Sequence, residues 1–152
     1  MAARDRAVGD VMPRQVTPIE KPKKKRKSGG GLYGNGPKGK ATKLHAAVVR
    51  ARGACEGCGA TTQLQCCHIL TRGGLATRTD LDNAVCGCAS CHAKWTANPL
   101  LFGDFVRQRY GQAHLERVQA KFYAGVGGKF NDAFWEAECV RLQALLDEVS
   151  RG

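Results

Sequence analysis

The sequence lacks long apolar stretches and internal repeats. No run approaches the roughly 20 apolar residues that span a bilayer, and the N-terminus carries no apolar segment of the kind found in secretion signals. These absences argue against membrane and secreted proteins. We therefore expect a cytoplasmic protein without a membrane partner.

Acidic residues are scarce, mainly in the first third of the chain. The 152 residues include 24 Lys and Arg but only 13 Asp and Glu, which gives a net charge of +11. Residues 1–50 hold 13 basic and 3 acidic residues, whereas residues 51–152 are nearly neutral. Because such a basic segment attracts polyanions, we expect a nucleic acid as the partner.

Residues 1–44 show neither the period of a strand nor that of a helix, and Gly, Pro, Lys and Ser dominate them. We expect a disordered basic arm here. Its densest run is predicted to contact phosphate groups without regard to base sequence, through Lys21, Lys23, Lys24, Lys25, Arg26 and Lys27. Two alternatives are that the run only solubilises the protein, or that it serves as a nuclear-import signal, which it resembles.

Eight cysteines allow two interpretations. A secreted disulfide scaffold is the weaker one, because no secretion signal accompanies it. Two Cys-x-x-Cys pairs about thirty residues apart favour one structural Zn²⁺ site, with the ligands Cys55, Cys58, Cys88 and Cys91. Cys66 and Cys86 are expected to be strand residues that face a small core, and Cys139 to lie in the core of a helix.

The segments between and after the cysteine pairs predict a small α+β fold. Residues 63–70 and 83–86 are expected to form a β-hairpin, followed by a helix that begins at His92 and stops before Pro99. Apolar spacing predicts further helices over residues 41–52, 101–110, 112–123 and from Asn131 or Asp132 onward. The expected organisation is a disordered basic arm (1–44), a zinc-stabilised hairpin-and-helix domain (45–98) and a helical extension (99–152). His45 and His114 are expected to be surface histidines without a role.

Three residues follow the first cysteine pair in a recognisable order: His68 and Asn83 before the second pair, and His92 directly after it. Together with the pairs they resemble the HNH endonuclease family, whose ββα-metal fold is a β-hairpin followed by a helix around a metal ion. The resemblance covers residues 50–98, about a third of the chain. It implies a metal-dependent enzyme that hydrolyses phosphodiester bonds of DNA, by nicking or by cutting both strands, to leave a 5′-phosphate and a 3′-hydroxyl.

The resemblance also implies a role for each residue. His68 would be the general base, a task that a neutral imidazole suits at physiological pH. His92 would hold a divalent cation beside the scissile phosphate, and Asn83 would brace the hairpin by hydrogen-bonding to the backbone across it. Arg72 would clamp a phosphate with its planar fork, and Arg78 is a second candidate for the same task.

The chain departs from the family at Cys67, where many members carry an Asp or a His as a second metal ligand. A thiolate is a soft ligand, so a catalytic cation bound by Cys67 would be Mn²⁺, Ni²⁺ or Zn²⁺, whereas Mg²⁺ would be bound without it.

Compact basic proteins of this form resemble phage nucleases that act in genome packaging, recombination or junction processing. The host cytoplasm would then be the location, or the nucleus if the protein is eukaryotic, and phage or recombination proteins would bind the C-terminal helices. Two alternatives stay open: a non-catalytic zinc-finger module that binds nucleic acid, and an assembly factor of a packaging machine.

Overall fold

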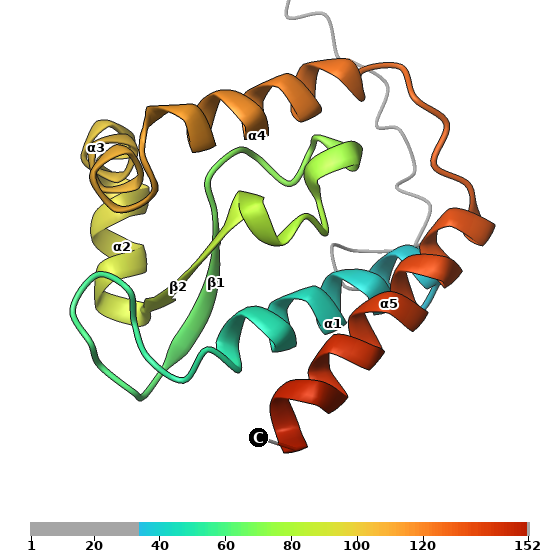
Figure 1. The fold of residues 1–152 in the computed structure, drawn as a ribbon, viewed down its shortest axis with the longest axis horizontal. Helices are drawn as coiled ribbons and strands as arrows, with labels where there is room; N and C mark the ends of the chain where they lie inside the picture. The colour runs from blue at the N-terminus through green and yellow to red at the C-terminus, as the bar shows by residue number, and fades with distance from the viewer. Residues whose placement is uncertain (1–33, 152) are drawn as a thin grey trace, which may run out of the picture.

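The computed structural model describes residues 34–151, which form a two-stranded hairpin surrounded by five α-helices. The strands are β1 (Leu64–His68) and β2 (Ala84–Cys88), with two 3₁₀ turns between them, η1 (Leu75–Thr77) and η2 (Leu81–Asn83). The helices are α1 (Pro37–Arg50), α2 (Ala89–Ala97), α3 (Pro99–Tyr110), α4 (Gln112–Ala124) and α5 (Asp132–Arg151). The small α+β fold that the sequence predicts is confirmed (Figure 1).

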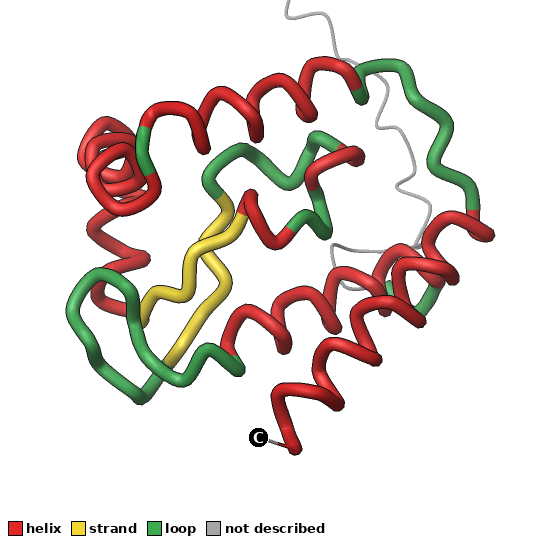
Figure 2. The backbone as a smooth tube through the Cα atoms, in the orientation of Figure 1, coloured by secondary structure: helices red, strands yellow, loops and turns green. Residues whose placement is uncertain are grey.

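The hairpin is covered on both faces, because successive side chains of a strand point to opposite sides. The strands are antiparallel, with Cys66 opposite Cys86 and Cys67 opposite Val85. The Cys67 face packs against α2, α3 and α4 through Trp95, Val106 and Leu115. The Cys86 face packs against Val49 of α1. Figure 2 shows the two short strands crossing in the middle of the molecule, between α4 and the pair formed by α1 and α5.

The first and last helices of the described region lie side by side (Figure 1). They bury a cluster made of Ala41, Val48, Trp135 and Leu142. The predicted arm boundary is therefore wrong, because residues 37–44 form the first half of α1. A helix was predicted only from residue 41, and composition hid its first residues, because packing against α5 rather than local propensity stabilises them. Residues 1–33 of the arm, with the basic run of residues 21–27, lie outside the described residues.

The remaining boundaries differ from prediction by a few residues. The helix expected from His92 begins at Ala89, because the Sγ of Cys88 caps it by accepting the backbone N–H of Cys91 at 3.4 Å. The expected end of α3 is confirmed at Gly111, whose φ of +86° is a left-handed conformation that glycine adopts easily. Asn131 caps α5 by accepting the N–H of Phe134 at 3.0 Å. Within residues 34–151, no helix combines the length and the apolar character that a membrane span needs.

Candidate functional site

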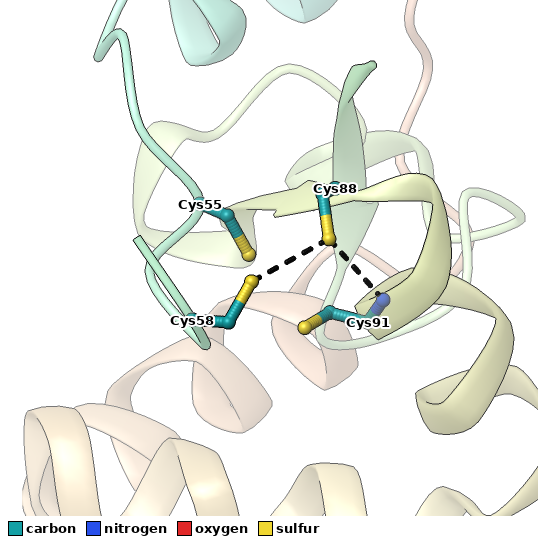
Figure 3. Close-up of side chains that lie close together, drawn as sticks. All are labelled: Cys55, Cys58, Cys88 and Cys91. Carbon is teal, nitrogen blue, oxygen red and sulfur yellow. Dashed lines mark hydrogen bonds between the residues drawn. The ribbon is translucent and has the colours of Figure 1, made fainter. Parts of the chain in front are cut away.

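Four cysteines converge at the end of the hairpin where Leu64 pairs with Cys88. Their Sγ atoms all lie within 4.8 Å of one another, and those of Cys58 and Cys88 are 3.7 Å apart. A tetrahedral zinc ion with Zn–S bonds of about 2.3 Å separates its sulfurs by about 3.8 Å. Figure 3 shows the four side chains facing a common centre, and all four thiols are free of disulfides. The donors and their spacing fit a zinc ion.

Tight turns bring the four thiols together. In the first Cys-x-x-Cys pair, the N–H of Gly59 donates to the carbonyl of Cys55 at 2.7 Å, and Gly59 takes a φ of +79°. Gly57, between the two cysteines, has no positive φ and is needed for space instead, because a Cβ there would lie 2.8 Å from the ring of Trp95. The second pair joins the end of β2 to the first turn of α2.

Backbone N–H groups favour the thiolate form of two of these cysteines. The N–H of Cys91 lowers the pKa of Cys88. Burial acts to raise the pKa of Cys55, but the N–H groups of Cys88, Gly57 and Cys58 outweigh it and bring the pKa to about 6. Zinc binds thiolates, so Cys55 and Cys88 are ready ligands, whereas burial raises the pKa of Cys91 to about 12 and its proton would have to leave when a cation binds.

Two residues of the nuclease-like signature, His68 at the end of β1 and His92 on α2, line a hollow of about 590 Å³ beside the hairpin. Thr71 and Arg107 add polar groups to its largely apolar wall. The ring of His68 approaches Cys66 on the strand face that packs against α1, with Nδ1 3.9 Å from the sulfur. Arg72 is half-buried and is near enough for its charge to affect the pKa of His68.

His68 is held in one orientation by its surroundings. Its Nε2 donates to the carbonyl of Arg78 at 3.0 Å, which leaves the lone pair on Nδ1. Burial lowers the pKa of His68, and the positive charges of Arg72, Arg78 and His92 lower it further against the opposing effect of the Arg78 carbonyl. The ring is therefore neutral at physiological pH and carries a basic nitrogen.

Asn83 is fully buried and ties the segment between the strands together. Its Oδ1 accepts the N–H of Leu70 at 2.7 Å, and its Nδ2 donates to the carbonyls of Leu70 at 3.2 Å and Thr77 at 3.0 Å. These bonds to the backbone across the hairpin are of the kind that the resemblance implies. All the polar atoms of this amide are thus engaged, so its contribution is positional.

Two residues that were candidates for binding phosphate or metal, Arg78 and Cys67, are buried inside the protein. Arg78 is only 6% exposed, and it donates to Thr42 Oγ1 and to the carbonyl of Arg72, both at 3.0 Å. A guanidinium buried in this way braces the loop, which argues against Arg78 as a phosphate clamp. Cys67 is 2% exposed in the apolar cluster with Trp95, and burial raises its pKa to about 12. Among residues 34–151, Cys67 belongs to no group of three or more mutually close metal-ligand side chains, so the structure argues against Cys67 as a ligand.

His92 bonds through Nδ1 to the side-chain oxygen of Gln65, a contact that nothing in the sequence indicated. Among residues 34–151, the groups of three or more mutually close His, Cys, Asp or Glu ligands include neither His92 nor Cys67. One such group is the four-cysteine cluster. The structure therefore brings His92 to the hollow outside any such group.

The other group is His45, Cys66 and His68. His45 was predicted to be exposed, which is wrong: it is fully buried on the inner face of α1. Burial, followed by the charge of His68, lowers its pKa to about 4. One signal was available, because His45 lies four residues after Ala41 and three before Val48, on the buried stripe of α1. Cys86 is fully buried on the same side of the hairpin, as predicted.

Comparisons with protein-family models, with curated proteins and with solved structures find no match.

Proposed function

We propose that this protein is a metal-dependent DNA endonuclease of the HNH type, with structural zinc bound by its four clustered cysteines. The observation that carries the proposal is the arrangement around the hairpin. A zinc-type cluster lies at one end, and His68 and His92 line one hollow beside it.

The zinc part of the proposal follows from the spacing of the thiols. The separation of 3.7 Å between the sulfurs of Cys58 and Cys88 is close to the value for a tetrahedral ion. The cluster joins a loop, a strand end and a helix start, and it lies beside a small core. A structural ion at such a point stabilises folds that bury too little apolar surface to do without it.

His68 is the proposed general base. With its Nε2 proton held by the Arg78 carbonyl, Nδ1 takes the proton from a water molecule as that water attacks phosphorus. The same carbonyl then stabilises the imidazolium that forms. Asn83 keeps β1 and the loop after it in place and so orients this ring.

His92 is the proposed protein ligand of the divalent cation. Its Nδ1 is engaged with Gln65, so Nε2 is the ligand atom. A cation bound there would neutralise the charge that develops on the departing 3′-oxygen. Because Cys67 lies in the apolar cluster with Trp95 and in no ligand group among residues 34–151, no thiolate is expected on this cation, which favours Mg²⁺ or Mn²⁺.

DNA is the proposed partner because of the charge distribution. The basic run of residues 21–27 and Arg72 are the proposed phosphate contacts. Genome packaging, recombination and junction processing are the processes in which we propose that the protein acts, with protein partners bound through the C-terminal helices.

The test is a nicking assay on supercoiled plasmid with the full chain and Mg²⁺, Mn²⁺ or Ni²⁺. We expect conversion to the open circular form with at least one of these cations, and none when EDTA is added. An intact plasmid with every cation, under conditions where a gel shift shows binding, would contradict the proposal.

One observation favours a second candidate function, a non-catalytic zinc module that binds nucleic acid. The Nδ1 of His68, which would have to reach water, lies 3.9 Å from the sulfur of Cys66 on the side of the hairpin that faces α1. DNA binding without cleavage in the same assay would support this candidate.

A further inference from the structure

Three side chains from two elements meet at the far end of the hairpin from the four-cysteine cluster. Cys66 and His68 are two residues apart on β1, so they point to the same side of the strand. That side faces α1, from which the buried His45 reaches between them. The Sγ of Cys66 lies 3.7 Å from Nδ1 of His45 and 3.9 Å from Nδ1 of His68.

Both imidazoles are oriented by backbone carbonyls of the same short segment. The Nε2 of His45 lies 3.2 Å from the carbonyl of Asp80, and the Nε2 of His68 lies 3.0 Å from the carbonyl of Arg78. A carbonyl only accepts hydrogen bonds, so each ring carries its proton on Nε2. Each Nδ1 therefore directs a lone pair toward the sulfur. A histidine that binds a metal generally donates its other N–H to such a partner.

We propose that His45, Cys66 and His68 form a second metal site, which binds a soft divalent cation of the Zn²⁺ class. A tetrahedral zinc ion with a Zn–S bond of about 2.3 Å and a Zn–N bond of about 2.05 Å separates sulfur and nitrogen by about 3.6 Å. The two observed separations, 3.7 and 3.9 Å, are close to this value. Binding releases the thiol proton, and the fourth position of the ion is left to water.

The donor set selects among cations. Two imidazoles and one thiolate suit zinc, cobalt or cadmium, whereas magnesium prefers oxygen ligands and avoids thiolates. Burial raises the pKa of the Cys66 thiol to about 11 against the opposing charge of Arg72, so a bound cation would have to displace the thiol proton. The second site would therefore bind zinc, whereas the magnesium ion of the proposed cleavage reaction would be bound at His92.

A metal at this site has a consequence for catalysis, and this consequence rests on the proposed nuclease function. The ion occupies Nδ1 of His68, which is the nitrogen proposed to accept the proton from water. Zinc at the second site therefore inhibits cleavage. The site itself does not depend on the nuclease proposal, since it is defined by ligand geometry.

The primary test counts metal ions in the full chain by native mass spectrometry after zinc loading and desalting. We expect two zinc ions per wild-type chain and one in Cys66→Ser. Cys139→Ser is the matched control and keeps two, because Cys139 lies on α5 outside both clusters. A single zinc in the wild-type chain, or two in Cys66→Ser, overturns the proposal.

A second measurement covers the case in which Cys66→Ser does not fold. The chain loaded with ¹¹³Cd should give two NMR signals, one from four sulfurs and one from two nitrogens and a sulfur. His45→Gln should lose only the second signal, whereas His114→Ala should keep both. If the wild-type spectrum has only the four-sulfur signal, then His45, Cys66 and His68 bind no metal, and the proposal is overturned.

The inhibitory effect is read separately in the nicking assay with Mg²⁺. Added zinc should slow the wild-type chain at least tenfold and leave Cys66→Ser unchanged. Inhibition of both chains to the same extent would overturn the regulatory role. A wild-type chain that holds two zinc ions but cuts no DNA would contradict the nuclease proposal and leave the second site supported.

Discussion

The two ends of the hairpin hold different kinds of cluster. At the Cys88 end, four thiols come from two short turns, Cys55 to Cys58 and Cys88 to Cys91. At the His68 end, the group needs His45 from a helix that precedes β1 by more than a dozen residues, and carbonyls from the segment between the strands. The first cluster is encoded by local spacing, and the second exists only once α1 has packed on the hairpin. The first suits a structural role, and the second is adjacent to the proposed chemistry.

The largest expected effect comes from breaking the four-cysteine end. Cys88→Ser removes a zinc ligand and weakens the cap of α2. Structural zinc contributes on the order of 10 kcal/mol in small domains, as much as a typical domain's whole stability, so the variant should be unfolded. Circular dichroism with thermal melts, with and without a chelator, measures this. Cys139→Ser is the control. A melting temperature of Cys88→Ser within a few degrees of the wild-type value would contradict the prediction.

The variant Asn83→Ala tests the His68 end of the hairpin. The change leaves the buried N–H of Leu70 and the carbonyl of Thr77 without the partner they have now. We expect the free energy of unfolding, measured in urea, to fall by about 3 kcal/mol. Asn98→Ala is the matched control, because it removes one exposed capping bond to Leu101 and should cost only about 1 kcal/mol. Equal losses in the two variants would show that Asn83 does not hold the hairpin.

Between the two ends, Gly87→Ala tests how tightly the hairpin packs on α2. A Cβ at this position would lie 2.7 Å both from the sulfur of Cys67 and from the ring of Trp95. Overpacking of this kind should lower the free energy of unfolding by about 2 kcal/mol. Gly103→Ala, on α3 with its nearest neighbour at 3.7 Å, should instead raise stability by up to about 1 kcal/mol. Urea unfolding of both variants measures these changes. An unchanged free energy of unfolding in Gly87→Ala would mean that this face is loosely packed.

The smallest expected effect is the pH dependence of cleavage. Burial lowers the pKa of His68, so the neutral form that can act as a base already dominates at pH 6.5. The rate should be level from about pH 7 to pH 8 and should fall about tenfold per unit once the pH drops below that lowered pKa. Single-turnover rates with zinc held constant measure this. A rate that stays level from pH 5 to pH 8 would argue against a histidine base.

The comparison of the two ends also shows what could be predicted from the sequence. The four thiols, the hairpin and the C-terminal helices follow from motif spacing and apolar periodicity, which are local properties. The buried state of Arg78 does not, because it looks like a surface residue until α1 packs beside it and Thr42 accepts its Nε–H. The start of α1 at Pro37 was missed for the same reason, since its stability comes from contact with α5. His45 lies on α1 itself, and its place on the apolar stripe is the one sign of its burial.

Cys66 illustrates the limit most simply. Its strand position and its pairing opposite Cys86 follow from the alternation of side chains, and these indicate only a residue that faces a core. Its approach to two imidazoles depends on a helix that the sequence does not assign to that face. Sites built from one turn can therefore be predicted from spacing, whereas a site that spans two elements needs the packed structure.

The most direct test of the central claim is the rate of plasmid nicking by His68→Ala relative to wild type, with Mg²⁺ present and folding checked by circular dichroism. The account predicts a loss of at least about 100-fold, because a positioned general base contributes about 10² to 10⁴ in rate. His114→Ala, a histidine on α4 that bonds to the carbonyl of Asp82, should retain nearly full activity. Equal rates for His68→Ala and wild type would contradict the account.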